Sequence, residues 1–176
     1  MMGDRSEGTL KQLQRLFNLG AVGAMTDEQL LEWFVSRRDP EAAAAFEELV
    51  IRHGPMVLDV CRRVLGDVHD AEDGFQATFL VLADRARSII RRGSVGSWLF
   101  GVAYRVSSRA RVRAARQRVS ERMITERTPE AYIPVQVDLD RDILYAEVAR
   151  LPDRLRAPIV MCYLQGLTYL DRKSVV

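Results

Sequence analysis

Arginine is the residue type that this sequence concentrates most strongly in one place. Residues 85–127 hold 12 Arg, no Lys and 2 Glu, a net charge of +10. The segment before it, residues 26–84, holds 5 basic against 13 acidic residues and has a net charge of −8. Arginine presents a planar fork of donors that fits phosphates and guanine edges. The pattern therefore predicts one surface for a polyanion and a separate acidic surface for another partner; a solvated basic helix without a partner is the simpler alternative.

Aromatic side chains lie among these arginines. Trp98, Phe100 and Tyr104 interleave with them, and aromatic rings can stack on unpaired bases while arginines hold the phosphates. We interpret Trp98 as an anchor in the hydrophobic core. Phe100 or Tyr104 is then the better candidate for a residue that stacks on a base.

Residues typical of catalysis or metal binding form no recognisable arrangement. His53 and His69 each stand at an expected helix boundary, where a surface or capping role explains them. Glycine-rich phosphate loops, HExxH and paired cysteine motifs are absent from the sequence. Cys61 and Cys162 lie in apolar periodic segments, so we expect buried, reduced thiols, and a thiol–imidazole pair at Cys61 is disfavoured. We expect no enzymatic activity, no cofactor and no metal.

The elements that position the arginines are expected to be helices. The 176 residues are 48% hydrophobic and include only 11 Gly and 6 Pro, which favours an all-α protein over a β-sandwich or barrel. The sequence contains no apolar run long enough to span a bilayer and no secretory signal, so we expect a cytoplasmic protein without membrane contact.

Helical periodicity runs through most of the chain and gives specific expectations for where helices begin and end. An amphipathic helix is expected around Leu10–Phe17, and a break is expected at His53-Gly54-Pro55. Expected starts are a capping box of Thr26 with Gln29, Asp39-Pro40-Glu41, a cap at Asp70, a cap at Ser97, Asp138 or Asp140, and Pro152; expected ends are Gly66 and Gly166.

Three segments carry a resemblance to a known family. They are FEELVIRHGPMVLDVCRRVLGDVHDAEDGFQATFLVLA (46–83), SVGSWLFGVAYRVSSRAR (94–111) and LPDRLRAPIVMCYLQGLT (151–168). In this order they resemble the extracytoplasmic-function (ECF) group of sigma-70 family RNA polymerase sigma factors, especially the set common in planctomycete-type genomes. The likeness covers residues 26–168. It implies a helical factor that binds core RNA polymerase and directs transcription initiation at specific promoters.

For the acidic segment, the resemblance implies contact with the clamp helices of the polymerase's largest subunit. The matching positions are Asp70, Asp73 and Gln76, and Ala77 stands where the family often has an acidic residue. An anti-sigma factor is a further partner that the resemblance allows. The alternative function is a helical adaptor that binds polymerase or nucleic acid without initiating transcription.

For the arginine segment, the resemblance implies promoter DNA as the partner. The loop at residues 88–97 would hold a flipped base of the minus-ten element, and the helix after it would grip the non-template strand. Arg105 stands where many members have Asn. The implied DNA-binding residues are Arg91, Arg92, Ser94, Phe100, Tyr104, Arg105, Arg109, Arg111, Arg113 and Arg116.

The resemblance also divides the chain. We expect an N-terminal extension at residues 1–25, sigma region 2 at 26–127, a linker at 128–138 and an incomplete helix-turn-helix region 4 at 139–170. The last six residues, DRKSVV, match the translation of a common sequencing adapter. We therefore expect a C-terminally truncated factor with a non-native tail at 171–176, the alternative being a natural truncation.

Overall fold

The structure, a computed structural model, describes residues 22–89, 94–124 and 139–165, with no side chains described at 121–142. These parts of the chain contain helices and no strand, which confirms the predicted all-α class. The expected helix around Leu10–Phe17, the linker at 128–138 and everything beyond Gln165 lie outside the described residues. The elements are α2 (Asp27–Ser36), α3 (Glu41–Leu65), α4 (Val68–Ile89), α5 (Val95–Ile124), α6 (Leu139–Arg150), α7 (Asp153–Ile159) and the π-helical turn η1 (Val160–Leu164).

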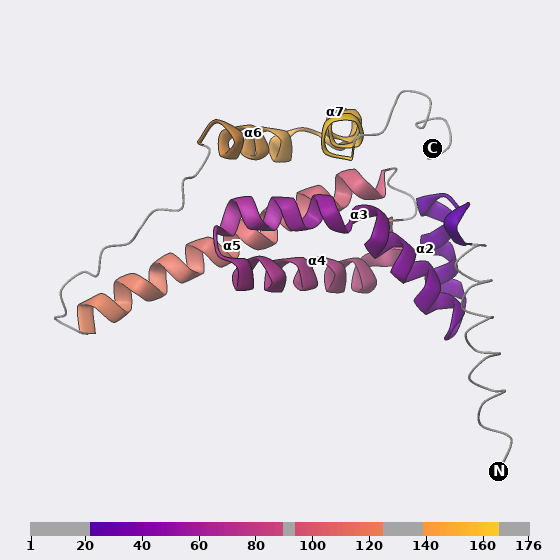
Figure 1. The fold of residues 1–176 in the computed structure, drawn as a ribbon, viewed down its shortest axis with the longest axis horizontal. Coiled ribbons are helices and arrows are strands. Elements are labelled where there is room, and N and C mark those ends of the chain that lie inside the picture. Colours follow the sequence, from indigo (N-terminus) through magenta and orange to yellow (C-terminus); the bar gives the residue numbers. More distant parts are fainter. Residues whose placement is uncertain (1–21, 90–93, 125–138, 166–176) are drawn as a thin grey trace, which may run out of the picture.

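Helix α3 lies at the centre of the bundle, and α2, α4 and α5 pack against it. Figure 1 shows α4 on one side of α3 and α5, with α6 and α7 on the opposite side. The core-facing side of α3 includes Leu49, Val57, Val60 and Cys61, all fully buried, at the three- and four-residue spacing of one helix face. The helices of the described chain thus share one hydrophobic core. No helix in these ranges is long and apolar enough to cross a membrane.

The predicted break at His53-Gly54-Pro55 is wrong, because α3 runs without interruption for 25 residues with Pro55 inside it. His53 is only 4% exposed, and Gly54 lies against the ring of Phe75. A proline inside a helix costs about 3 kcal/mol. Burying several large apolar side chains on the same helix contributes more than that, at about 1.5–3 kcal/mol each. Tertiary packing therefore overrides the local breaking signal.

Several helix ends follow the predicted chemistry, but three predicted caps do not. Asp39 does not cap α3, because the N-cap of that helix is Pro40, without a side-chain hydrogen bond. The capping box is confirmed: Thr26 N donates to Gln29 Oε1 at 2.8 Å, and Gln29 N donates to Thr26 Oγ1 at 3.3 Å. Gly66 ends α3 with a φ of 73°, as expected for a glycine C-cap.

The starts of α4 and α5 both lie three residues earlier than predicted. Asp67, not Asp70, caps α4 by accepting from the backbone N of His69 and of Asp70 at 2.9 and 3.0 Å. Ser94, not Ser97, caps α5 by accepting from Ser97 N at 3.2 Å. In each case the chain offers two capping residues three positions apart. The earlier residue makes the capping hydrogen bonds, and the later one lies within the helix.

Helices α3, α4 and α5 come close together at Gly74. A Cβ atom there would lie 3.3 Å from Cys61 Sγ and 3.4 Å from Ser107 Oγ, so only glycine fits without displacing a neighbour. Burial raises the pKa of the Cys61 thiol, which is a free cysteine as predicted. Cys162 is also free, but it is half-buried.

A buried group of charged residues joins α2 to α3. His53 Nε2 contacts Asp27 Oδ2 at 2.7 Å, and Arg52 Nη1 donates to Asp27 Oδ1 at 3.2 Å. Arg52 also donates to the carbonyls of Val22, Gly23 and Met25 and to Glu48. The prediction that His53 has a surface or capping role is therefore wrong. Burial alone would raise the pKa of Asp27, but hydrogen bonds and charges from His53 and Arg52 outweigh it and hold this pKa below 3.8.

We expect Asp27→Asn to lower the free energy of unfolding at pH 7 by about 1.5–3 kcal/mol, the range for hydrogen bonds to charged groups. Because the folded-state pKa is lowered, Asp27 stabilises the fold fully above pH 3.8 and loses this contribution as the pH falls through the folded value. Urea unfolding at pH 7 and in acid should show a difference between wild type and variant that shrinks in acid. Asp84→Asn, at an exposed surface pair, is the control and should change little. An equal loss in both variants would contradict the role of Asp27.

Candidate functional site

One candidate surface is the solvent-facing side of α4. Asp70, Asp73 and Gln76 are all exposed there. Their spacing of three residues places them along one side of the first half of the helix. The structure therefore brings the three predicted polymerase-binding residues together on one accessible face.

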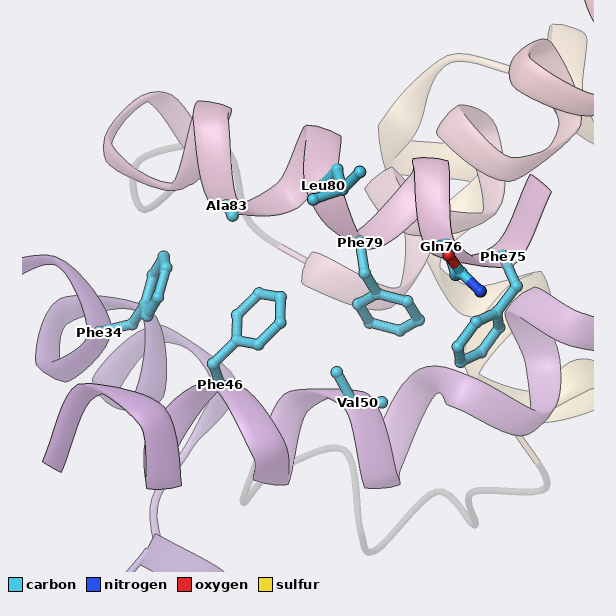
Figure 2. Close-up of a pocket in the computed structure, with 8 residues that line it drawn as sticks. All are labelled: Phe34, Phe46, Val50, Phe75, Gln76, Phe79, Leu80 and Ala83. Carbon is cyan, nitrogen blue, oxygen red and sulfur yellow. The ribbon is translucent and has the colours of Figure 1, made fainter. Parts of the chain in front are cut away.

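An apolar groove lies directly beside this face, and Figure 2 shows side chains from three helices converging on it. Its volume is about 390 Å³. Gln76 belongs both to the acidic face and to the groove, and Leu80, 71% exposed, stands at its edge. The lining residues are Phe34 from α2, Phe46 and Val50 from α3, and Phe75, Gln76, Phe79, Leu80 and Ala83 from α4.

Aromatic contacts hold the floor of this groove together. The ring centroids of Phe34 and Phe46 are 5.0 Å apart, and those of Phe75 and Phe79 are also 5.0 Å apart. Phe46 and Phe79 meet edge to face at 6.2 Å. Sequence reasoning assigned these rings to helix faces in the core and missed the groove. The available signal was that four of the six Phe lie between residues 34 and 79.

The second candidate surface is a row of arginines along α5. Arg105, Arg109, Arg113 and Arg116 are spaced by four, four and three residues, and all four are exposed. From residue 109 to 120 every side chain is exposed except the half-buried Ala114. Figure 1 shows this half of α5 projecting beyond the end of the bundle, where a long ligand can reach it.

The other residues predicted to bind DNA are placed differently. Arg111 lies on another side of α5, since its Nη1 reaches back to Val64 O at 3.4 Å. Ser94 is half-buried and caps the helix. Arg91 and Arg92 lie outside the described residues. The row therefore contains only four of the ten residues that were predicted to bind DNA.

The two stacking candidates have different surroundings. Phe100 is completely buried, with its ring 5.6 Å from that of Tyr145, so the prediction that it offers an accessible ring is wrong for this arrangement. The reason is that α6 covers it, which periodicity within α5 does not reveal. Tyr104 is half-buried against the core and keeps part of its side chain exposed. Trp98 is partly buried and packs against the core.

Among the described residues, three hydrogen bonds attach the C-terminal helices to the bundle, and the Arg63 guanidinium lies 5.5 Å from the centre of the Tyr145 ring. Sequence reasoning found none of these contacts. Tyr145 Oη donates to Asp59 Oδ2 at 2.6 Å, and Arg156 Nε donates to Ser97 Oγ at 3.1 Å. Gln165 Nε2 contacts His53 Nδ1 at 2.7 Å. The two ring nitrogens of His53 therefore join Asp27 on one side to Gln165 on the other. Burial and then Asp59 raise the pKa of Tyr145 to about 12, so its hydroxyl is a donor at neutral pH.

Positive charge is crowded where the arginine row meets α7. Burial lowers the pKa of Arg105, and the charges of Arg156 and Arg109 lower it further, while Asp153 opposes them. The lowered pKa of Arg105 thus reflects burial first and the neighbouring positive charges second.

Comparison with known proteins defines the class of the helical domain. Residues 49–117 match the sigma-70 region 2 family, a stretch that includes the acidic face of α4 and the whole arginine row. The chain is also similar to "ECF RNA polymerase sigma factor SigE" from Mycolicibacterium smegmatis, with 31% identity over 147 residues. That similarity covers 77% of this chain and 54% of the relative, so the chain spans about half the relative's length.

These matches define a protein with a sigma-70 region 2 domain. More specifically, the chain belongs to the ECF group of the sigma-70 family, as the sequence resemblance implied.

Proposed function

We propose that this protein is a sigma factor that binds core RNA polymerase and directs transcription initiation at specific promoters. The observation that carries the proposal is the separation of an acidic, apolar-edged face on α4 from an arginine row on α5, within the matched region 2. Such a protein needs two partners at once, a polymerase and a nucleic acid. It would act in the cytoplasm, where both are found.

The α4 face is the proposed polymerase surface. Asp70, Asp73 and Gln76 would contact the clamp helices of the largest subunit through charge and hydrogen bonds. The adjoining groove would take apolar side chains of the same partner, because Gln76 borders both features. Interfaces of this kind combine a buried apolar centre with a polar rim.

The α5 row is the proposed surface for minus-ten promoter DNA. Arg105, Arg109, Arg113 and Arg116 would contact successive phosphates of one strand, since one face of a helix presents them in line. Tyr104 is the remaining candidate for stacking on a base. Region 2 would extend over residues 26–127, and α6, α7 and η1 would belong to a partial region 4 at 139–170.

A run-off transcription assay separates the sigma factor from the adaptor. Core RNA polymerase from the source bacterium, supplemented with this chain, is tested on promoter fragments selected from the same genome. A specific transcript that depends on the chain supports the proposal. Stable binding to core polymerase without any such transcript would favour the adaptor.

We expect Asp73→Arg to abolish co-purification with core polymerase, because the reversed charge faces a surface that should be complementary to the acidic one. The control is Glu147→Arg, an equal charge reversal at an exposed position on α6, on the opposite side of the bundle. Circular dichroism and thermal unfolding should be unchanged in both. Retained co-purification of Asp73→Arg would contradict the assignment of the α4 face.

We expect Leu80→Ser to weaken polymerase binding by about tenfold, because a largely exposed leucine at the groove edge becomes buried only when a partner covers it. Leu155→Ser, at an exposed leucine on α7, is the control. Titration of labelled chain with core polymerase measures both. If Leu80→Ser and Leu155→Ser bind core polymerase with equal affinity, the groove is not part of the interface.

We expect Arg109→Ala combined with Arg113→Ala to weaken DNA binding and to reduce the salt dependence. Each lost phosphate contact should lower the slope of log K against log salt by about 0.7–0.9. Fluorescence anisotropy at several salt concentrations measures this slope. The control is Arg38→Ala with Arg62→Ala. It removes the same charge from exposed positions within the acidic segment, residues 26–84. An unchanged slope in the α5 variant would exclude phosphate contacts there.

A further inference from the structure

The projecting half of α5 carries arginines on two opposite sides. Arg111 and Arg118 are seven residues apart, which is close to two turns of a helix, so they lie on the same side. Arg109 and Arg113 stand two residues before and two residues after Arg111. At about 100° per residue, this spacing places both on the side opposite to Arg111. The segment therefore presents the arginine row on one side and a separate pair, Arg111 and Arg118, on the other.

The side that carries this pair continues the buried face of α5. Counting back from Arg111 in steps of four gives Ser107 and Ala103, which are both fully buried. Counting forward, Ala114 lies between Arg111 and Arg118 and is the one half-buried side chain from residue 109 to 120. The pair therefore lies on the side of α5 nearer the bundle, while the arginine row faces away from it.

The turn between α3 and α4 receives Arg111. The Nη1 atom of this arginine donates to Val64 O at 3.4 Å. Val64 belongs to the last turn of α3, where carbonyl groups lack partners within the helix and the helix dipole places negative charge. A guanidinium is therefore a favourable partner at this position. Figure 1 shows this turn at the end of the bundle where α5 begins to project.

Asp67, in the same turn, adds a carboxylate that interacts with the charge of Arg118. Its side chain accepts from the backbone N of Asp70 and of His69 at the start of α4. The hydrogen bond from Asp70 N does most to lower the pKa of Asp67; the hydrogen bond from His69 N and the charges of His69 and Arg118 lower it further and, together, they outweigh burial. The turn thus offers a carbonyl and a carboxylate to two arginines of α5.

We propose that Arg111 and Arg118 are positioning residues: they hold the projecting half of α5 against the α3–α4 turn and thereby fix the direction of the arginine row. The inference rests on the proposed DNA-binding function of the row, and it assigns to Arg111 a contact within the protein in place of a phosphate contact. Repulsion along the row acts against helical order, and the anchor on the opposite side counteracts it. A row that is already held in place loses less conformational freedom when a strand binds.

Two variants of the full chain with the same loss of charge test the proposal. Arg111→Gln with Arg118→Gln removes the anchor, and Arg109→Gln with Arg113→Gln removes two members of the row. Binding of a fluorescein-labelled single-stranded dodecanucleotide of mixed sequence is measured by anisotropy over a series of salt concentrations. We expect the anchor variant to bind about fivefold more weakly than wild type, the effect of about one hydrogen bond, with an unchanged salt slope. In the row variant, each lost phosphate contact should lower the slope by about 0.7.

A change on the acceptor side separates the anchor from a simple effect of charge. Asp67→Asn keeps a good N-cap for α4 but removes the carboxylate charge that interacts with Arg118. Loss of a negative charge alone should strengthen binding to DNA. Glu72→Gln, at an exposed position of α4, removes the same charge and is the matched control. We expect Asp67→Asn to bind the oligonucleotide about threefold more weakly than Glu72→Gln, and equal binding would contradict the anchor at Arg118.

Hydrogen exchange distinguishes positioning from general stability. Amides of residues 109–120 should lose protection in the anchor variant, whereas those of residues 49–60 in the buried middle of α3 should keep it. Lost protection in α3, an unchanged affinity, or a salt slope as low as that of the row variant would overturn the proposal. If the row variant itself keeps the wild-type slope, the proposed DNA-binding function fails; if only the row variant behaves as expected, the positioning role alone fails.

Discussion

Asp27 and His53 meet where α2, α3 and the end of η1 come together, and their contact ties the groove and the C-terminal helices to α3. Through Asp27, the pair fixes α2, which supplies Phe34 to the groove beside the acidic face. Through the other imidazole nitrogen, His53 holds Gln165 and with it the helices that cover α5. Burying a carboxylate requires such partners. One satisfied polar cluster thereby positions elements on two sides of α3.

Local signals in the sequence were sufficient to predict structure where the deciding interaction joins residues only a few positions apart. The Thr26–Gln29 capping box, the Gly66 C-cap and the buried positions Thr78 and Leu82 of α4 are all of this kind. Prediction failed where a distant element decides. Pro55 stays inside α3 because the residues on either side of it, including Gly54 and Met56, are buried in the core, and Phe100 is inaccessible because Tyr145 of α6 packs against it. The groove is formed by side chains from three helices, so the periodicity of any one helix does not predict it.

Charge composition indicated two charged surfaces, but it did not show which residues of each segment are exposed on them. The net charge of −8 over residues 26–84 includes Asp27, which is buried, and Asp73, which is exposed. The arginine segment likewise divides into a row in line with Arg109 and a residue, Arg111, that turns back to the end of α3. A helix distributes adjacent residues around its axis, so a run of one charge becomes a narrow stripe. The proposed contacts with phosphates and polymerase follow these stripes.

The exposed half of α5 has a further thermodynamic meaning. Its arginines repel one another at i, i+3 and i, i+4 spacing, by about 0.2–0.5 kcal/mol per pair, and few of its side chains are stabilised by packing. The helix–coil balance of this stretch is therefore set by the high helix propensity of its Arg and Ala residues, by the repulsion between its arginines and by its counterions. A polyanion that neutralises the stripe also orders the backbone beneath it. If the stripe binds a polyanion as proposed, part of the gross binding free energy would be spent on the conformational entropy that the ordered backbone loses.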